Sequence, residues 1–133
     1  MTNTHRVSQN KATMKKIVDI FNTGDLADVD LIFSPDYIDH QRPAEMEING
    51  PNEFKQIVMG TRQSLRKLKV TIEELIAEDD KVVGRLQWHI TDLAGKKIKR
   101  ETIDILRFVN NQVVEHWGAE AWRTDKSSAD PAS

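Results

Sequence analysis

The residues from Val82 to Trp117 constrain the fold more than any other part of the chain. They contain three runs rich in β-branched and aromatic residues, VVGRLQWHI, KIKRETIDILRF and VVEHW, which polar turn residues separate. Runs of this composition are typical of β-strands. The Asn110-Asn111 pair between the second and third runs tolerates the positive φ of a tight hairpin turn. The pattern therefore predicts consecutive strands in an antiparallel meander.

Asp104 is the unusual residue of this meander, because it lies between isoleucines in the middle run. Burying a carboxylate without a partner is costly unless the group takes up a proton. Asp104 therefore either lies on a solvated face or lines a pocket in which proton exchange is useful. A purely structural alternative is an ion pair with Arg85 or Arg100 in the sheet.

The N-terminal half of the chain has helical periodicity. Apolar residues at i, i+3, i+4 and i+7 predict a first helix over residues 10–22. A second, short helix is expected from Asp25, ending at Ser34-Pro35 because proline cannot continue the hydrogen-bond ladder. A third helix is expected from Pro51, followed by strands over residues 70–78, 81–90, 97–109 and 112–117.

Helices followed by an antiparallel meander predict an α+β fold, with the N-terminal helices packed on one face of a curved antiparallel sheet. The 133 residues suffice for one domain, which we expect over residues 10–123, between a flexible N-terminus (1–9) and a flexible tail (124–133). Both faces of the sheet carry apolar residues. A homodimer formed through the sheet is therefore expected.

Composition excludes several classes of function. The chain has no cysteine, which excludes thiolate catalysis and cysteine zinc sites, and its net charge is −2, which predicts neither nucleic-acid nor membrane binding. It has no apolar run of membrane-spanning length and no signal-like N-terminus, so a cytoplasmic protein is expected. A basic cluster follows the third helix, and we interpret it as complementing the helix dipole rather than as a phosphate site: Arg62, Arg66, Lys67 and Lys69.

Six segments carry a resemblance to a known family. They are NTGDL (22–26), PDYIDH (35–40), GPNEF (50–54), AEDDKVV (77–83), DILRF (104–108) and VEHW (114–117). Together they resemble the SnoaL-like polyketide cyclases of the nuclear-transport-factor-2-like superfamily, over roughly residues 12–118. The resemblance implies a cone-shaped α+β barrel with a pocket between helices and sheet. It also implies intramolecular aldol condensation without metal or organic cofactor.

The resemblance also assigns site residues. The family's strand aspartate, the acid/base, corresponds to Asp104, and its Gln-x-His pair corresponds to Gln87 and His89. We therefore expect Asp104 and His89 to be catalytic and Gln87 to bind substrate, because an enolate needs hydrogen-bond donors already in place. His40 and His116 are further pocket candidates, with a core histidine as the alternative for each. Tyr37 is a candidate hydrogen-bond donor in the pocket, and the alternative is that its ring anchors the core.

Three hypotheses for function remain open at this point. The first is a cofactor-free cyclase or isomerase acting on a small hydrophobic carbonyl compound; the short loop 92–95 argues against a large polyketide. The second is a dehydratase or hydrolase that pairs His89 with Asp104. The third is non-catalytic binding of an apolar small molecule. The histidines lack the close spacing of metal ligands, so no metal is expected.

Overall fold

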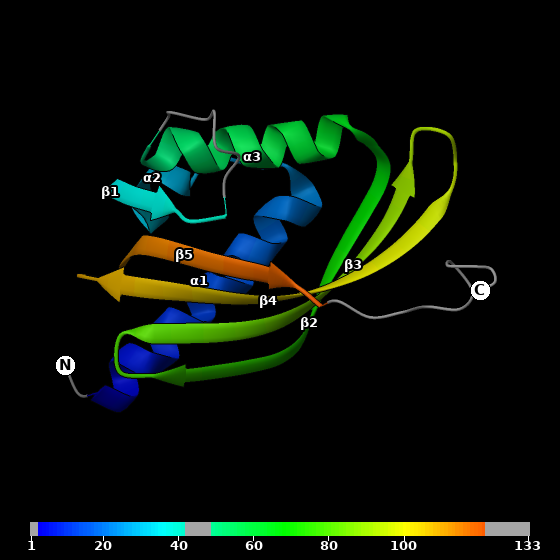
Figure 1. The fold of residues 1–133 in the computed structure, drawn as a ribbon. Helices are drawn as coiled ribbons and strands as arrows, with labels where there is room; N and C mark the ends of the chain where they lie inside the picture. The colour runs from blue at the N-terminus through cyan, green and yellow to red at the C-terminus, as the bar shows by residue number, and fades with distance from the viewer. Residues whose placement is uncertain (1–2, 42–48, 122–133) are drawn as a thin grey trace.

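The computed structural model describes residues 3–41 and 49–121 (Figure 1). Three helices and five strands follow one another along the chain: α1 (Asn3–Thr23), α2 (Val29–Ile32), β1 (Phe33–Asp39), α3 (Pro51–Gln63), β2 (Leu65–Glu78), β3 (Lys81–Asp92), β4 (Lys97–Val109) and β5 (Gln112–Glu120).

The strands form one sheet in the order β1-β5-β4-β3-β2. The last four strands are the predicted antiparallel meander. β1 adds to its edge by pairing parallel with β5, so the sheet is mixed rather than purely antiparallel. The sheet curls around its helices without closing into a barrel (Figure 1). The predicted α+β class, with N-terminal helices on a curved sheet, is thus confirmed.

Some boundaries differ from those predicted. α1 begins at Asn3 rather than Asn10, so the segment expected to be flexible is helical from that residue onward. The short helix ends at Ile32, and Phe33 already belongs to β1, where its ring is buried against Tyr37 and Phe54. The predicted flexible tail at 124–133 lies outside the described residues.

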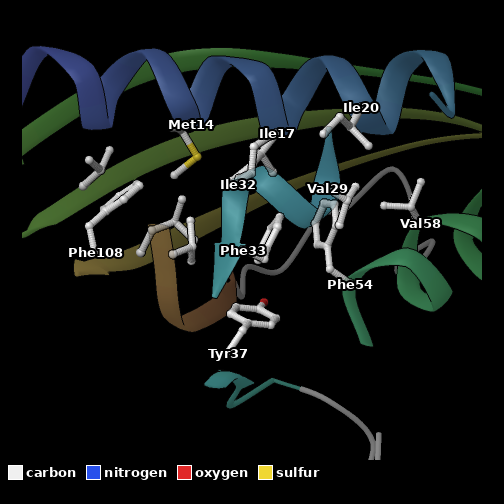
Figure 2. Packing of buried hydrophobic residues seen from close by; sticks show 13 residues of the cluster. Met14, Ile17, Ile20, Val29, Ile32, Phe33, Tyr37, Phe54, Val58 and Phe108 are labelled. Carbon is white, nitrogen blue, oxygen red and sulfur yellow. The ribbon is translucent and has the colours of Figure 1, made fainter. Parts of the chain in front are cut away.

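The core fills the space between the helices and the inner face of the sheet (Figure 2). α1 packs on β2 and β3, and α3 on β1 and β2. The rings of Phe33 and Phe54 stack 4.2 Å apart, and Phe33 meets Tyr37 edge-on at 4.7 Å. Each such buried apolar side chain contributes roughly 1.5–3 kcal/mol. This packing fixes the start of β1, and with it the residues that follow Phe33.

The outer face of the sheet carries both charged and apolar residues. Arg85 pairs with Glu74 and Glu101, while Ile76 and Ile103 remain 61% and 38% exposed. None of the helices in the part of the chain that the structure describes is long and apolar enough to cross a membrane.

Candidate functional site

A cavity of about 310 Å³ lies between the helices and the inner face of the sheet. Its wall is mostly apolar: Met14, Ile17, Val18, Phe21, Phe33, Phe54, Ile57, Leu86, Trp88 and Leu106. Its polar lining consists of Tyr37, Asp39, Gln41, Thr61, Asp104 and His116. Small-molecule sites typically combine an apolar wall with a few polar groups, and this volume is at the small end of their range.

His116 joins two carboxylates at this cavity. Its Nε2 lies 2.8 Å from Asp104 Oδ1, and its Nδ1 lies 2.9 Å from Asp39 Oδ1. Asp39 and Asp104 are 5% and 8% exposed, so both contacts lie in the protein interior. β5 makes this possible because it lies between β1 and β4. His116 is directly opposite Asp39 on β1, and Asp104 is opposite Gly118, two residues further along β5.

The two carboxylates keep the imidazole protonated. Burial by itself lowers the pKa of His116, but the hydrogen bonds to Asp104 and Asp39 outweigh it and raise the pKa from 6.5 to about 9. Burial likewise opposes ionisation of Asp39, yet the hydrogen bond from His116 and the backbone N–H of Gln41 leave its pKa below the usual value. At neutral pH an imidazolium therefore donates to two carboxylates.

Asp39 is held further by Tyr37. The Tyr37 hydroxyl donates to Asp39 Oδ2 over 3.1 Å. Burial, followed by the charge of Asp39, raises the pKa of Tyr37, so the phenol remains a hydrogen-bond donor. On the other side, the backbone N–H of Asp39 donates to Glu53 Oε1 on α3 at 3.3 Å. These contacts fix the end of β1 against α3 and hold the Asp39 carboxylate in place.

The second oxygen of Asp104 receives a hydrogen bond whose direction is certain. Thr102 Oγ1 lies 2.7 Å from Asp104 Oδ2 and 2.8 Å from Trp88 Nε1. An indole N–H only donates and an ionised carboxylate only accepts, so the Thr102 hydroxyl accepts from Trp88 and donates its own proton to Asp104. Asp104 therefore accepts one hydrogen bond on each oxygen, and its orientation is set by both.

Glycines flank Asp104 on both neighbouring strands, Gly84 on β3 and Gly118 on β5. A Cβ atom at Gly118 would overlap the side-chain amide of Gln41 and lie 2.9 Å from Asp104 Oδ1. The missing side chain thus leaves room for the Gln41 amide beside the carboxylate. Gln41 is a polar residue of the cavity that the sequence reasoning did not single out.

The structure does not bring Gln87 and His89 to this cavity. Asp104 is paired with Gly84, so the residues of β3 that share its face are Leu86 and Trp88, which line the cavity. Gln87 and His89 alternate with these and belong to the other face, and His89 lines a separate, cationic groove. The family-based assignment thus differs from the observed arrangement by one position along β3, and neighbouring positions of a strand face opposite sides of the sheet.

His40 is also on the outer side, and Tyr37 and His116 are in the cavity lining. The His40 ring stacks on Trp117 at 4.9 Å, and its Nε2 lies 2.9 Å from Glu115 Oε2. The hydrogen bonds from His40 and then Arg107 lower the pKa of Glu115. The alternative pairing of Asp104 with Arg85 or Arg100 does not occur, since Arg85 binds Glu74 and Glu101, and Arg100 lies near Glu120.

Three residues of the site were missed from sequence: Asp39, Gln41 and Thr102. Two of them carried a signal. Asp39 alternates with His40, so a buried Tyr37 places Asp39, and not His40, on the inner face. Thr102 is two residues from Asp104 and shares its face. Gln41 follows the end of β1 and has no periodicity that could identify it.

The arrangement can exchange a proton with a ligand in an apolar cavity. A carboxylate, an imidazolium and an amide lie together, and the hydrogen bonds of His116 to Asp39 and Asp104 hold the charged groups in place before any ligand binds. No group of His, Asp or Glu side chains within 3–41 and 49–121 is arranged to hold a metal ion.

Comparison with solved structures places the fold among known proteins. TsrD from Streptomyces laurentii superposes with a TM-score of 0.76 at 20% identity, covering 85% of this chain and 88% of that one. A candidate polyketide cyclase from Bacillus cereus ATCC 10987 gives 0.76 at 24% identity, covering 84% and 74%. An NTF2-like protein from Burkholderia pseudomallei gives 0.72 at 18% identity, covering 85% and 91%. No curated protein sequence matches the chain.

The sequence itself carries the family assignment. The model of the SnoaL-like polyketide cyclase family matches residues 11–121, which include every helix and strand of the sheet except the first turns of α1. The chain belongs to the SnoaL-like polyketide cyclase family.

Proposed function

We propose that the protein is a cofactor-free cyclase or isomerase in which Asp104 is the general acid and base for a small hydrophobic carbonyl compound. The observation that carries this proposal is the contact of His116 with both Asp104 and Asp39 beside an apolar cavity. The volume of about 310 Å³ favours a small substrate.

In the proposed reaction, Asp104 takes a proton from the carbon next to the substrate carbonyl. The electron pair of the broken C–H bond forms an enolate, and the enolate carbon attacks a second carbonyl carbon of the same molecule. The resulting alkoxide takes the proton back from Asp104, so the product is an isomer of the substrate. His116 holds Asp104 in position and balances its charge.

The developing enolate oxygen needs a donor, and we assign this role to the Gln41 amide. Gln87, the donor expected from the family resemblance, belongs to the other face of β3. Gln41 lies beside Asp104 in the cavity lining, and Gly118 leaves space for it. Preorganised donors of this kind are commonly the largest contribution to stabilising an oxyanion.

Proton abstraction can be tested before the natural substrate is identified. Small apolar ketones such as acetophenone and 1-indanone, incubated with the protein in D₂O, exchange their α-protons at a rate that NMR measures. General acid–base catalysis is typically worth about 100-fold or more. For a ketone that fits the cavity we expect exchange at least about tenfold faster with the wild-type protein than with Asp104→Asn.

The controls separate chemistry from folding. Asp104→Asn keeps the shape of the side chain. Its circular dichroism spectrum should match that of the wild type, and it should still unfold cooperatively. Asp19→Asn, an exposed position on α1, is the matched control and should exchange α-protons like the wild type. Equal exchange in Asp104→Asn and wild type on a ketone that binds the cavity removes Asp104 from the acid/base role.

A dehydratase is a second candidate, and the imidazolium of His116 favours it. A group with a pKa of about 9 can protonate a leaving hydroxyl while Asp104 removes a proton from the adjacent carbon. Loss of water from a small β-hydroxy ketone, followed by the ultraviolet absorption of the enone, distinguishes this reaction from cyclisation. If apolar ketones bind without any proton exchange or water loss, the third hypothesis, non-catalytic binding, applies.

We also propose a homodimer through the outer face of the sheet, where Ile76 and Ile103 are exposed between ion pairs. Such exposed apolar residues within one face are typical of an interface. Light scattering should give twice the monomer mass for the wild type and the monomer mass for Ile103→Lys; a wild-type monomer contradicts the proposal.

A further inference from the structure

A second hollow, of about 710 Å³, lies where the ends of β2, β3 and β4 curl past the C-terminal end of α3 (Figure 1). Among the residues that the structure describes, its lining contains no aspartate or glutamate, and it contains six basic residues besides His89: Arg62, Arg66, Lys67, Lys69, Lys97 and Lys99. We call this hollow the cationic groove. It is separate from the apolar cavity, and the proposed reaction does not use it.

The basic residues of the cationic groove are not simply helix-capping cations. α3 ends at Gln63, whereas Lys67 and Lys69 lie on β2 and Lys97 and Lys99 on β4. The helix-dipole interpretation from sequence therefore does not hold for Lys67 and Lys69, because the dipole acts only within the last turn.

The two arginines of the groove bind backbone carbonyl oxygens. Arg62 Nη1 donates to Phe21 O and Asn22 O at 2.8 and 2.9 Å, and Arg66 Nη2 donates to Leu93 O at 3.4 Å. Within the described parts of the chain neither arginine forms an ion pair with a carboxylate, so both contribute positive charge to the groove.

The lysines contrast with cations elsewhere on the sheet. Arg85 and Arg107 each bind a glutamate on a neighbouring strand. Among the residues in 3–41 and 49–121, no acidic side chain forms an ion pair with Lys67, Lys69 or the two lysines of β4. Like charges on neighbouring strands destabilise a sheet, so this uncompensated charge calls for a functional account.

The register sets the size of the charged area. Lys69, His89 and Lys99 are aligned across the three strands, and Lys67, Thr91 and Lys97 form the next row on the same face. At about 3.3 Å per residue and about 4.8 Å per strand, the four lysine Cα atoms enclose roughly 7 by 10 Å. Flexible lysine side chains can close this distance further, so four ammonium groups can reach one small ion.

We propose that the cationic groove binds a small, multiply charged oxyanion, the phosphate or carboxylate groups of a metabolite-sized ligand. Ammonium groups are compact point charges that bind phosphate and carboxylate without requiring one fixed geometry. The area of roughly 7 by 10 Å suits one such ion. It is far below the roughly 800 Å² that each partner buries in a stable protein interface. A protein, a membrane or a nucleic acid is therefore the weaker fit.

Inorganic pyrophosphate and citrate test the proposal, one for each oxyanion chemistry. Calorimetric titration in about 0.15 M salt, where exposed charges are already screened beyond about 8 Å, selects against diffuse attraction. We expect saturable binding of at least one anion, accompanied by NMR shift changes of the His89 ring protons. In the double variant Lys69→Glu/Lys99→Glu the affinity should fall at least about tenfold, because two attractive charges become repulsive.

The controls use exposed positions. Lys15→Glu on α1 makes the same kind of charge change away from the groove and should leave the affinity within about twofold. The double variant Lys69→Gln/Lys99→Gln removes the two charges without reversing them. It should fold even if the charge-reversal variant does not, and it should bind the anion more weakly than the wild type. If the double variants lose affinity for pyrophosphate alone, the groove is assigned to phosphate groups, and if they lose affinity for citrate alone, it is assigned to carboxylate groups. No saturable binding of either anion, or equal binding by wild type and the double variants, overturns the proposal. The lysines then serve only to protect strand edges.

Discussion

Asp39 and Asp104 bind opposite nitrogens of one imidazole ring, although β1 and β4 are not neighbours in the sheet. β5 separates them and supplies His116. Two carboxylates this close to one another would repel if nothing lay between them. The imidazolium converts the repulsion into two charge-assisted hydrogen bonds, which are stronger than neutral ones.

This relationship predicts a pH dependence of stability. The pKa of His116 is raised in the folded protein from 6.5 to about 9, so its contribution is complete below pH 6.5 and is lost as the pH rises toward 9. The shift corresponds to about 3 kcal/mol. Urea unfolding between pH 6 and 10 should show this decline in the wild type and a much flatter profile in His116→Gln. The same slope in both proteins would contradict the assignment.

At acid pH the sign reverses, because the pKa of Asp39 is lowered in the folded state. Its contribution is present above its unfolded value and disappears as the pH falls through the folded one. Asp39→Asn should therefore lose less stability than the wild type between pH 5 and 2. The measurement is the urea midpoint at each pH, with Asp19→Asn as the surface control.

The hydrogen-bond chain from Trp88 through Thr102 to Asp104 predicts a different outcome for two substitutions of Thr102. Thr102→Ser keeps the hydroxyl. Thr102→Val keeps the shape but removes the hydrogen bonds to Trp88 Nε1 and Asp104 Oδ2. The valine variant should lose about 1–3 kcal/mol of stability, the cost of an unsatisfied buried polar group. Its Trp88 indole N–H resonance should move upfield, whereas the serine variant should resemble the wild type in both measurements. Ketone exchange should fall in Thr102→Val more than its stability alone explains.

Periodicity predicted the elements of the fold because it depends only on local spacing. The meander from β3 to β5 is contiguous in sequence and joined by short turns, so alternation and turn residues identified it. β1 was not predicted as a strand along its full length. It pairs with β5 from far along the chain, and Ser34-Pro35 looked like a helix stop. Propensity carries no information about such a long-range partner.

The site was predicted in part, and the reason lies in strand parity. Asp104, His116 and Tyr37 are in the cavity lining, as proposed from the sequence. Gln87 and His89 are not, because Asp104 is opposite Gly84, which sets the inner face as Leu86 and Trp88. The register of the β3–β4 hairpin depends on how the loop at 92–95 closes. The sequence alone leaves that register one residue uncertain, and a shift of one residue moves every side chain to the other face.

Replacing Gly118 with alanine is expected to lower activity without a large loss of stability. A methyl group there would displace the Gln41 amide and approach Asp104 Oδ1 to 2.9 Å. Ketone exchange should fall in Gly118→Ala while the Tm changes little, since Gln41 can rotate away. Gly60→Ala on α3 is the matched control: among the described residues, no atom outside the neighbouring helix backbone lies within 4 Å of the new methyl group. Removing a helical glycine should stabilise by up to about 1 kcal/mol. Undiminished exchange in Gly118→Ala would argue against Gln41 as the donor.

The apolar cavity predicts that filling it abolishes binding. Ile57 on α3 lines the cavity, and a tryptophan in its place would occupy much of the 310 Å³. The affinity for a neutral solvatochromic dye should fall at least about tenfold in Ile57→Trp, and overpacking should cost about 1–3 kcal/mol of stability. Leu31→Trp introduces a tryptophan at an exposed position of α2, away from the cavity, and should leave dye binding unchanged. A neutral dye avoids attraction to the cationic groove, so unchanged affinity in Ile57→Trp would place the ligand outside the cavity and remove Asp104 from its reach.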